Sequence, residues 1–225
     1  MFHADHADFK WPMKRFKDYL IGQMARQNVT VHLDTRATPE LIAQGNFDAV
    51  IAAVGAVAAK PPVEGAESPE VLTPLQVFGN DGALGQRVIV VGGSETGTET
   101  ALYLARCGHQ VTVLTRRDRL ATDAQGSHYY GSLMAALQEQ TQLQAICRAV
   151  TRAVSPHSVT YTDGTGTSHT LEADSVVACG GMTPLQQEAM AFASAAPRFF
   201  AIGDCSRVGN IHTCTRGAFS AAMQI

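Results

Sequence analysis

The sequence has no apolar run long enough to cross a bilayer. Its longest uncharged apolar stretch extends from Ala49 to Ala59, whereas a membrane helix needs roughly 20 apolar residues. The first residues, MFHADHAD, lack the apolar centre of a secretory leader. Neither sign of charge dominates, because 20 acidic residues accompany 17 basic ones and the net charge is −3. We therefore expect a folded cytoplasmic protein that binds neither a membrane nor nucleic acid.

Several signatures of catalytic and metal chemistry are also missing. The cysteines include no CxxC pair, which excludes a thioredoxin-type dithiol and a local zinc or iron–sulfur knuckle. The sequence contains no YxxxK, GxSxG or HExxH motif, so it does not indicate a short-chain dehydrogenase, a serine hydrolase or a zinc protease. We therefore identify no catalytic residue and no metal ligand. The basic residues Lys10, Lys14, Arg15 and Lys17 are interpreted as a solvated patch on a surface helix.

The segment from Val88 to Thr115 carries the most specific pattern in the chain. It reads as a buried strand (VIVV), a glycine turn (GGSETG), a helix and a second strand (VTVLT), which is the nucleotide-binding half of a Rossmann unit. Gly92 permits the tight bend, and Gly97 lets the helix approach the strand closely. The backbone amides of residues 94–98 are expected to point at a pyrophosphate that the helix dipole attracts.

This turn departs from GxGxxG at its middle glycine, which is Ser94. A side chain there pushes the phosphates outward, so the unit either binds a nucleotide with altered geometry or serves only to pack. About 20 residues further on, an NAD site offers an acidic residue to the ribose, but this chain has Arg116 and Arg117. Two guanidinium groups suit a 2′-phosphate, which favours NADPH over NADH, although such a pair also occurs on solvated edges.

An apolar strand that ends in glycine is predicted at three places outside this segment. Phe47–Ala56 is a predicted buried strand ending at Gly55, ADSVVACGG ends at Gly180, and FFAIGDC ends at Gly203. The other expected elements are helices over Pro12–Arg26 and Tyr130–Gln140 and from Arg216 to the end, a strand at Val29–Leu33, and a hairpin of Ser158–Tyr161 with Ser168–Leu171 around Asp163.

The order of these motifs resembles a known family. AVGA before a proline-rich loop, VGGSETGTETA, ACGG and IGDC look like the carboxyl-terminal region of flavoproteins that bind two dinucleotides. The likeness is greatest to NADH:flavin oxidoreductases of the Old Yellow Enzyme type, such as 2,4-dienoyl-CoA reductase, 2-enoate reductase and trimethylamine dehydrogenase. The resemblance implies an α/β, Rossmann-like FAD/NAD(P)-binding fold, with the NAD(P) domain inserted into an incomplete FAD domain.

The resemblance also implies roles for individual residues. It places Glu99 near the nicotinamide end of the pyridine nucleotide, Asp204 beside the ribityl and phosphate of FAD, and Ala218 against the flavin. The full set of expected cofactor-binding residues is Gly92, Gly93, Ser94, Glu95, Thr96, Gly97, Glu99, Arg116, Arg117, Gly180, Gly55, Gly203, Asp204 and Ala218. Asp204 alternatively only caps a turn.

Residues 1–80 contain no second glycine-rich turn for the FAD pyrophosphate. We therefore expect residues 1–80 to be part of an FAD-binding domain, residues 81–182 to form the NAD(P) domain, and residues 183–225 to return to the FAD domain. The chain resembles a fragment whose FAD- and FMN-bearing part lies elsewhere, and FAD binding by the chain alone is doubtful.

The implied function is that of an oxidoreductase module. It passes a hydride from NAD(P)H to FAD, and onward to FMN and an enoate-type substrate in the parent enzyme. The alternative is a degenerate structural or electron-transfer module that binds no pyridine nucleotide. A sheet that lacks its first βαβ segment also exposes strand edges, so we expect self-association into a homo-oligomer.

Overall fold

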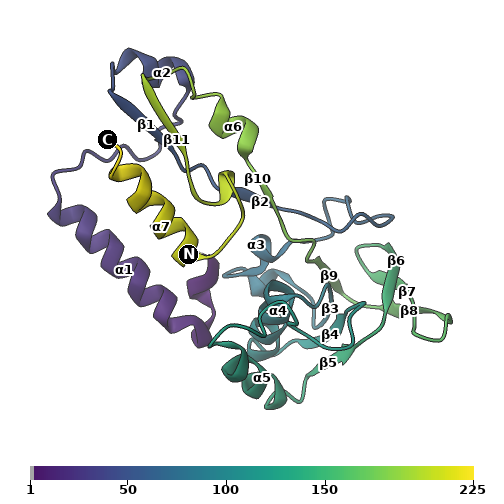
Figure 1. Cartoon of the computed structure of the whole chain (residues 1–225). Helices are drawn as coiled ribbons and strands as arrows, with labels where there is room; N and C mark the ends of the chain where they lie inside the picture. Colours follow the sequence, from purple (N-terminus) through teal and green to yellow (C-terminus); the bar gives the residue numbers. More distant parts are fainter. Residues whose placement is uncertain (1–2) are drawn as a thin grey trace. The chain divides into compact units, whose positions relative to one another are not determined.

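The computed structural model describes residues 3–225 and their side chains from Asp5 onward, and the chain divides into two compact units. Unit 1 comprises the residues up to Asn28 together with Ala58–Gly181, and unit 2 comprises Val29–Val57 with Met182–Ile225. Both contain parallel strands and helices (Figure 1). The predicted α/β, Rossmann-like class is confirmed.

Unit 1 is built on a parallel sheet of strand order β5-β4-β3-β9. Its strands are β3 (Arg87–Val91), β4 (Gln110–Leu114), β5 (Leu143–Ile146) and β9 (Ser175–Ala178). Alternate residues of β3 and β4 pack with α4 (Glu95–Arg106) and α5 (Tyr130–Gln138) in one apolar core. Nine consecutive residues of α4, from Gly97 to Ala105, are buried, so this helix is held firmly against the sheet.

The opposite face of the sheet packs against a second, antiparallel sheet of order β6-β7-β8. Its strands are β6 (Val150–Val154), β7 (Ser158–Thr162) and β8 (Ser168–Glu172). The predicted hairpin is confirmed, and Asp163 organises its turn by accepting hydrogen bonds from the backbone N–H groups of Thr165 and Thr167 at 2.8 and 3.0 Å. Unit 1 also contains η1 (His3–His6), η2 (Asp8–Lys10), α1 (Trp11–Arg26), α3 (Pro74–Val77) and η3 (Asp81–Ala83).

Unit 2 has a smaller core around Ala52, Ala189 and Cys205. Strands β1 (Ala49–Ala52) and β11 (Arg198–Ala201) pair in parallel. The helices are α2 (Pro39–Gln44), α6 (Gln186–Met190), η4 (Gly203–Cys205) and α7 (Ile211–Ala222). Strands β2 (Ala56–Ala58) and β10 (Met182–Pro184) pair with each other, at the points where the chain passes from one unit to the other.

Several expectations about local structure were wrong. Val29–Leu33 is not a strand: its apolar side chains Val29, Val31 and Leu33 are exposed, and no partner strand in residues 3–225 satisfies its backbone. The strand β1 is only partly buried, because its two-stranded sheet offers little apolar cover. Helix α7 begins before Arg216, at Ile211, since Asn210 forms a capping box with Thr213.

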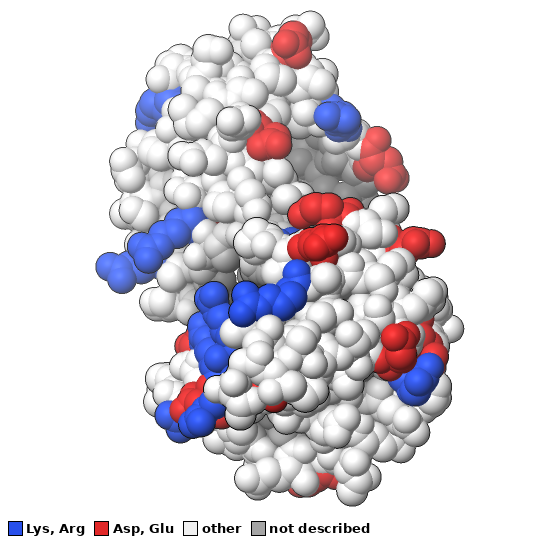
Figure 2. Space-filling model, turned by 90° about the vertical axis from the view of Figure 1, so that its right-hand side faces the viewer, with Lys and Arg blue, Asp and Glu red and all other residues white. Residues whose placement is uncertain are grey.

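The division into units also differs from the expected segment boundaries. Residues up to Asn28 and residues 58–80 belong to the same compact unit as the glycine turn, whereas they were grouped with the FAD-binding segment. Which cofactor each segment serves stays a prediction. Among the described residues, no helix combines the length and apolar character needed to cross a membrane. Figure 2 shows acidic and basic side chains together on one face, with uncharged residues between many of them.

Candidate functional site

The turn between β3 and α4 is built around three glycines that leave no room for a side chain. At Gly92, where φ is +110°, a Cβ would lie 2.6 Å from the carbonyl oxygen of Cys179. At Gly97 it would lie 1.8 Å from the carbonyl oxygen of Gly92. Both predicted glycine roles, the bend and the close approach of helix to strand, therefore have a steric cause.

The third constrained glycine is Gly93, which the GxGxxG pattern does not require. A Cβ at Gly93 would lie 2.7 Å from Cβ of Thr115 and 2.8 Å from a methyl carbon of Leu120. Ser94, in contrast, has extended backbone angles that any residue adopts, so the missing middle glycine strains nothing. The turn keeps its shape without that glycine.

The amides of the turn are only partly as expected. Thr98 N–H donates to the carbonyl of Ser94 at 2.9 Å, so it already belongs to the helical ladder and does not face a ligand. The amides of Thr96 and Gly97 lie in the first helical turn, where backbone N–H groups have no carbonyl acceptor within the helix. Ser94 occupies the N-cap position, but its side chain makes no capping hydrogen bond.

A carboxylate from elsewhere in the chain caps this helix. Glu95 N–H donates to both side-chain oxygens of Asp123, at 3.0 and 3.2 Å. Asp123 belongs to the segment 116–126, which we call the cap loop. Arg117 of the same loop donates to Thr122 and lies 3.5 Å from Asp123, while Arg116 is exposed. The expected 2′-phosphate ligand Arg117 is thus already engaged by an acidic side chain.

Glu99 lies one turn further along α4 in a buried ion pair. Its Oε2 accepts a hydrogen bond from Lys10 Nζ at 2.5 Å, and the two side chains are only 8% and 20% exposed. Burial raises the pKa of Glu99, and the charge of Lys10 opposes this shift. Lys10 was interpreted as a solvated surface residue, and this was wrong.

A phenol completes the surroundings of this ion pair. Burial, together with the nearby charge of Glu99, raises the pKa of Tyr129. Oε1 of Glu99 and the hydroxyl of Tyr129 are both buried, and neither has a hydrogen-bond partner within the described part of the chain. The two side chains lie close enough for each to shift the pKa of the other, so each is the nearest available partner of the other's buried oxygen.

Cys179 and Gly180 follow β9 at the same edge of the sheet. Burial raises the pKa of Cys179 to about 12, which disfavours the reactive thiolate form. A Cβ at Gly180 would lie 2.4 Å from the backbone of Lys60, and Gly180 N–H donates to Ala59 at 2.9 Å. Packing against the crossover segment is therefore enough to explain the glycine at position 180.

The expected FAD-binding residues lie in unit 2. Gly55 has a φ of +81° with open space where a side chain would stand, and Gly203 has a φ of +67°. Asp204 accepts a hydrogen bond from Gly209 N–H at 3.1 Å, which is the turn-capping role considered above. Ala218 is partly buried in α7. Positive φ angles account for the glycines at positions 55 and 203, and Asp204 has a structural task in its turn.

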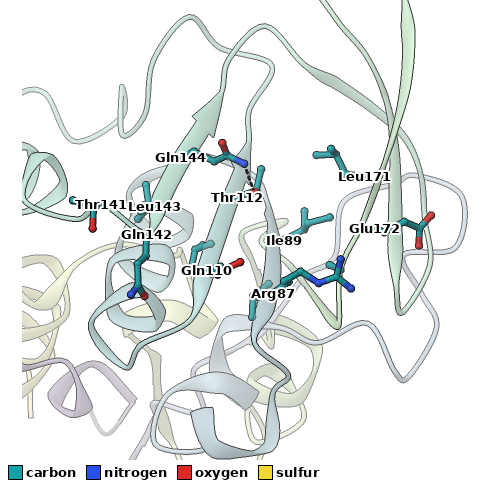
Figure 3. Close-up of a pocket in the computed structure, with 13 residues that line it drawn as sticks. Arg87, Ile89, Gln110, Thr112, Thr141, Gln142, Leu143, Gln144, Leu171 and Glu172 are labelled. Atoms are coloured by element: carbon teal, nitrogen blue, oxygen red, sulfur yellow. Dashed lines mark hydrogen bonds between the residues drawn. The ribbon is translucent and has the colours of Figure 1, made fainter.

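Unit 1 contains a separate cavity of about 430 Å³ at the opposite ends of the strands. Figure 3 shows it over the amino-terminal halves of β3, β4 and β5, with Leu171 and Glu172 of β8 on one side. Gln144 donates to the hydroxyl of Thr112 at 2.9 Å in its floor. None of the sequence-predicted site residues lines it, so we do not assign it to the nucleotide.

Comparison with known proteins identifies the family. The model of the pyridine nucleotide-disulphide oxidoreductase family matches residues 24–218. The chain belongs to this family. The flavoprotein resemblance noted in the sequence is therefore confirmed. The domain implies binding of FAD and NAD(P).

Individual relatives agree with the family match. The chain is 29% identical to a bilirubin reductase of Mediterraneibacter gnavus over 95% of its length, and 29% identical to an NADH oxidase of Thermoanaerobacter brockii over 97%. A structure of 2-naphthoyl-CoA reductase in complex with 2-naphthoyl-CoA superposes on 99% of the chain with a TM-score of 0.92 at 22% identity. The chain spans about a third of the length of each, since it covers 33%, 34% and 34% of them.

Proposed function

We propose that this chain is the nucleotide-binding module of a flavin-dependent oxidoreductase. The observation that supports this most strongly is the turn at Gly92, where three glycines have no room for a Cβ, the third of them in the first turn of α4. Such a turn presents first-turn amides and the positive end of the helix dipole to a diphosphate. The family match over residues 24–218 supports the same site.

The chain's own residues would hold the pyridine nucleotide and orient it. The amides of Thr96 and Gly97 would receive the pyrophosphate, and Arg116 and Arg117 would receive a 2′-phosphate, which favours NADPH over NADH. The unpaired Oε1 of Glu99 would accept a hydrogen bond from the carboxamide at the nicotinamide end. NAD(P)H, when bound, supplies the hydride, so no side chain here needs to act as an acid or base.

In this proposal, FAD is bound partly by unit 2 and partly by polypeptide outside the 225 residues. Gly55, Gly203 and Asp204 would approach FAD, but the 225 residues contain no second glycine-rich turn for its pyrophosphate. A partner region or subunit that bears FAD and FMN would supply that turn. We infer that the chain alone holds FAD weakly, and that electrons pass from FAD to FMN and an enoate-type substrate only in the complete protein.

One observation favours a second candidate, a structural module that binds no pyridine nucleotide. The Asp123 carboxylate accepts from the amide of Glu95 at the start of α4, next to the amides of Thr96 and Gly97, to which the proposal assigns the phosphate. A negative side chain at this position opposes a negative ligand. The same contact satisfies one first-turn amide of α4 without any ligand, as a helix cap in a purely structural domain would.

Calorimetric titration of the chain separates the two candidates. The proposal predicts saturable binding of NADPH, with NADH binding roughly tenfold more weakly because it lacks the phosphate that Arg116 and Arg117 would contact. No heat with either nucleotide would favour the structural module. Tighter binding of NADH would contradict the role given to the two arginines.

A further inference from the structure

The cap loop places an acidic side chain of the protein on the proposed phosphate site. Asp123 accepts from Glu95 N–H through both oxygens, at 3.0 and 3.2 Å. A carboxylate at a helix N-terminus gains from the same orphan amide and the same dipole that attract a phosphate. The amides of Thr96 and Gly97, to which the proposal assigns the diphosphate, follow Glu95 directly in the first turn of α4. Asp123 and a dinucleotide therefore compete for the positive end of the same helix.

The cap loop itself is fixed, so the competition is decided by one side chain. Ala121 N–H donates to the carbonyl of Gly93 at 2.8 Å, and Leu120, Ala121 and Ala124 are buried. The side chain of Asp123, in contrast, is 42% exposed. Its carboxylate can leave Glu95 by rotating into water, while the buried residues of the loop stay in place.

Arg117 gives the displaced carboxylate a second partner. Its guanidinium lies 3.5 Å from Asp123 and donates to Thr122. A carboxylate that leaves the helix end would keep this ion pair, so its charge stays close to the site. That charge would weaken the attraction of Arg117 for a ligand phosphate, because opposite charges at this separation largely cancel.

We propose that Asp123 competes with the pyridine nucleotide for the N-terminus of α4. The affinity of the Gly92 turn for a diphosphate is then lower than it would be without this carboxylate. The inference rests on the proposed function, since it requires the turn to bind a dinucleotide. It also assigns the acid at position 123 a role in affinity beyond helix capping.

The test is the affinity for NADPH of the wild-type chain and of Asp123→Asn, by calorimetry at one fixed ionic strength. Asparagine still accepts from Glu95 N–H but carries no charge, so the fold is kept. The expected result is binding about tenfold tighter than wild type. Asp118→Asn is the matched control, because Asp118 lies in the same loop and faces Arg119 at 4.0 Å. It should change the affinity less than twofold.

The outcomes separate this inference from the proposed function. If wild type binds NADPH and Asp123→Asn binds no more tightly than Asp118→Asn, the inference is overturned and the nucleotide site stands. If only Asp123→Asn binds, both are supported. If neither protein binds although circular dichroism shows both to be folded, the proposed function fails, and the competition that depends on it fails too.

Discussion

Replacing Gly97 by alanine should destabilise the protein by about 3 kcal/mol and abolish nucleotide binding. The added methyl carbon would lie 1.8 Å from the carbonyl oxygen of Gly92 and 2.9 Å from its carbonyl carbon. Both atoms belong to the backbone, so no side chain can move aside and α4 must shift away from β3. Because the turn amides move with the helix, the cradle for phosphate is lost together with the packing. Urea unfolding of the chain measures the first effect, and calorimetry with NADPH measures the second.

Gly131→Ala is the matched control for this change. Gly131 lies within α5 of the same unit, and a Cβ there meets no atom within 4 Å. Alanine has the higher helix propensity, so this variant should be more stable than wild type by about 0.5–1 kcal/mol. A Gly97→Ala protein as stable as wild type would show that the close approach of helix and strand is not required.

Replacing Lys10 by methionine should cost about 3 kcal/mol of stability at pH 7. Methionine keeps most of the side-chain volume but removes the ammonium group that pairs with Glu99 at 2.5 Å. The carboxylate then remains in a site where it is only 8% exposed, and its other oxygen has no partner among the described residues. Removal of one member of a buried pair is costly for this reason. Thermal and urea unfolding measure the loss.

The loss should shrink as the pH falls. Burial raises the folded-state pKa of Glu99 above its ordinary value of 4.5, even with Lys10 present. For a group with a raised pKa, the contribution to stability is fully present below the unfolded pKa and is lost as the pH rises through the folded pKa. Without Lys10 the folded pKa rises further, so Lys10→Met should be closer to wild type in stability at pH 5 than at pH 7.

Two further variants test whether Glu99 is the cause. Adding Glu99→Gln to Lys10→Met should recover much of the stability at pH 7 and remove the added pH dependence. Lys14→Met alters an exposed lysine that pairs with Asp18 at 3.9 Å on α1, and it should change stability by less than about 0.5 kcal/mol. Equal losses at pH 5 and pH 7 for Lys10→Met would contradict the account of a buried, unpaired carboxylate.

The Rossmann unit could be predicted from the sequence because its signals are local. Four consecutive apolar residues, a glycine turn and a helical apolar face all lie within Val88–Thr115, and β3, α4 and β4 form there. The hairpin around Asp163 was equally local. Strands β5 and β6 were not foreseen, since their residues are only partly buried and their pairing depends on distant neighbours.

The partners at the site could not be predicted, because they come from segments with no fixed spacing to the turn. Lys10 reaches Glu99 across 89 residues of sequence, and Asp123 reaches Glu95 across 28. Lys10 and Asp123 each have other charged residues nearby in the sequence, and no sequence pattern indicates which of these side chains contacts α4. The strand expected at Val29–Leu33 failed for the opposite reason: its alternating pattern is real, but no partner strand lies beside it in the described structure.

The most direct test of the central claim is a nuclear magnetic resonance titration of the isotopically labelled chain with NADPH. If the Gly92 turn binds the diphosphate, the largest amide shifts should occur at residues 93–97, with smaller shifts at Asp123 as its carboxylate is displaced. Saturable binding that leaves these amides unchanged and moves signals elsewhere would contradict the account, because the nucleotide would then occupy a different part of the chain.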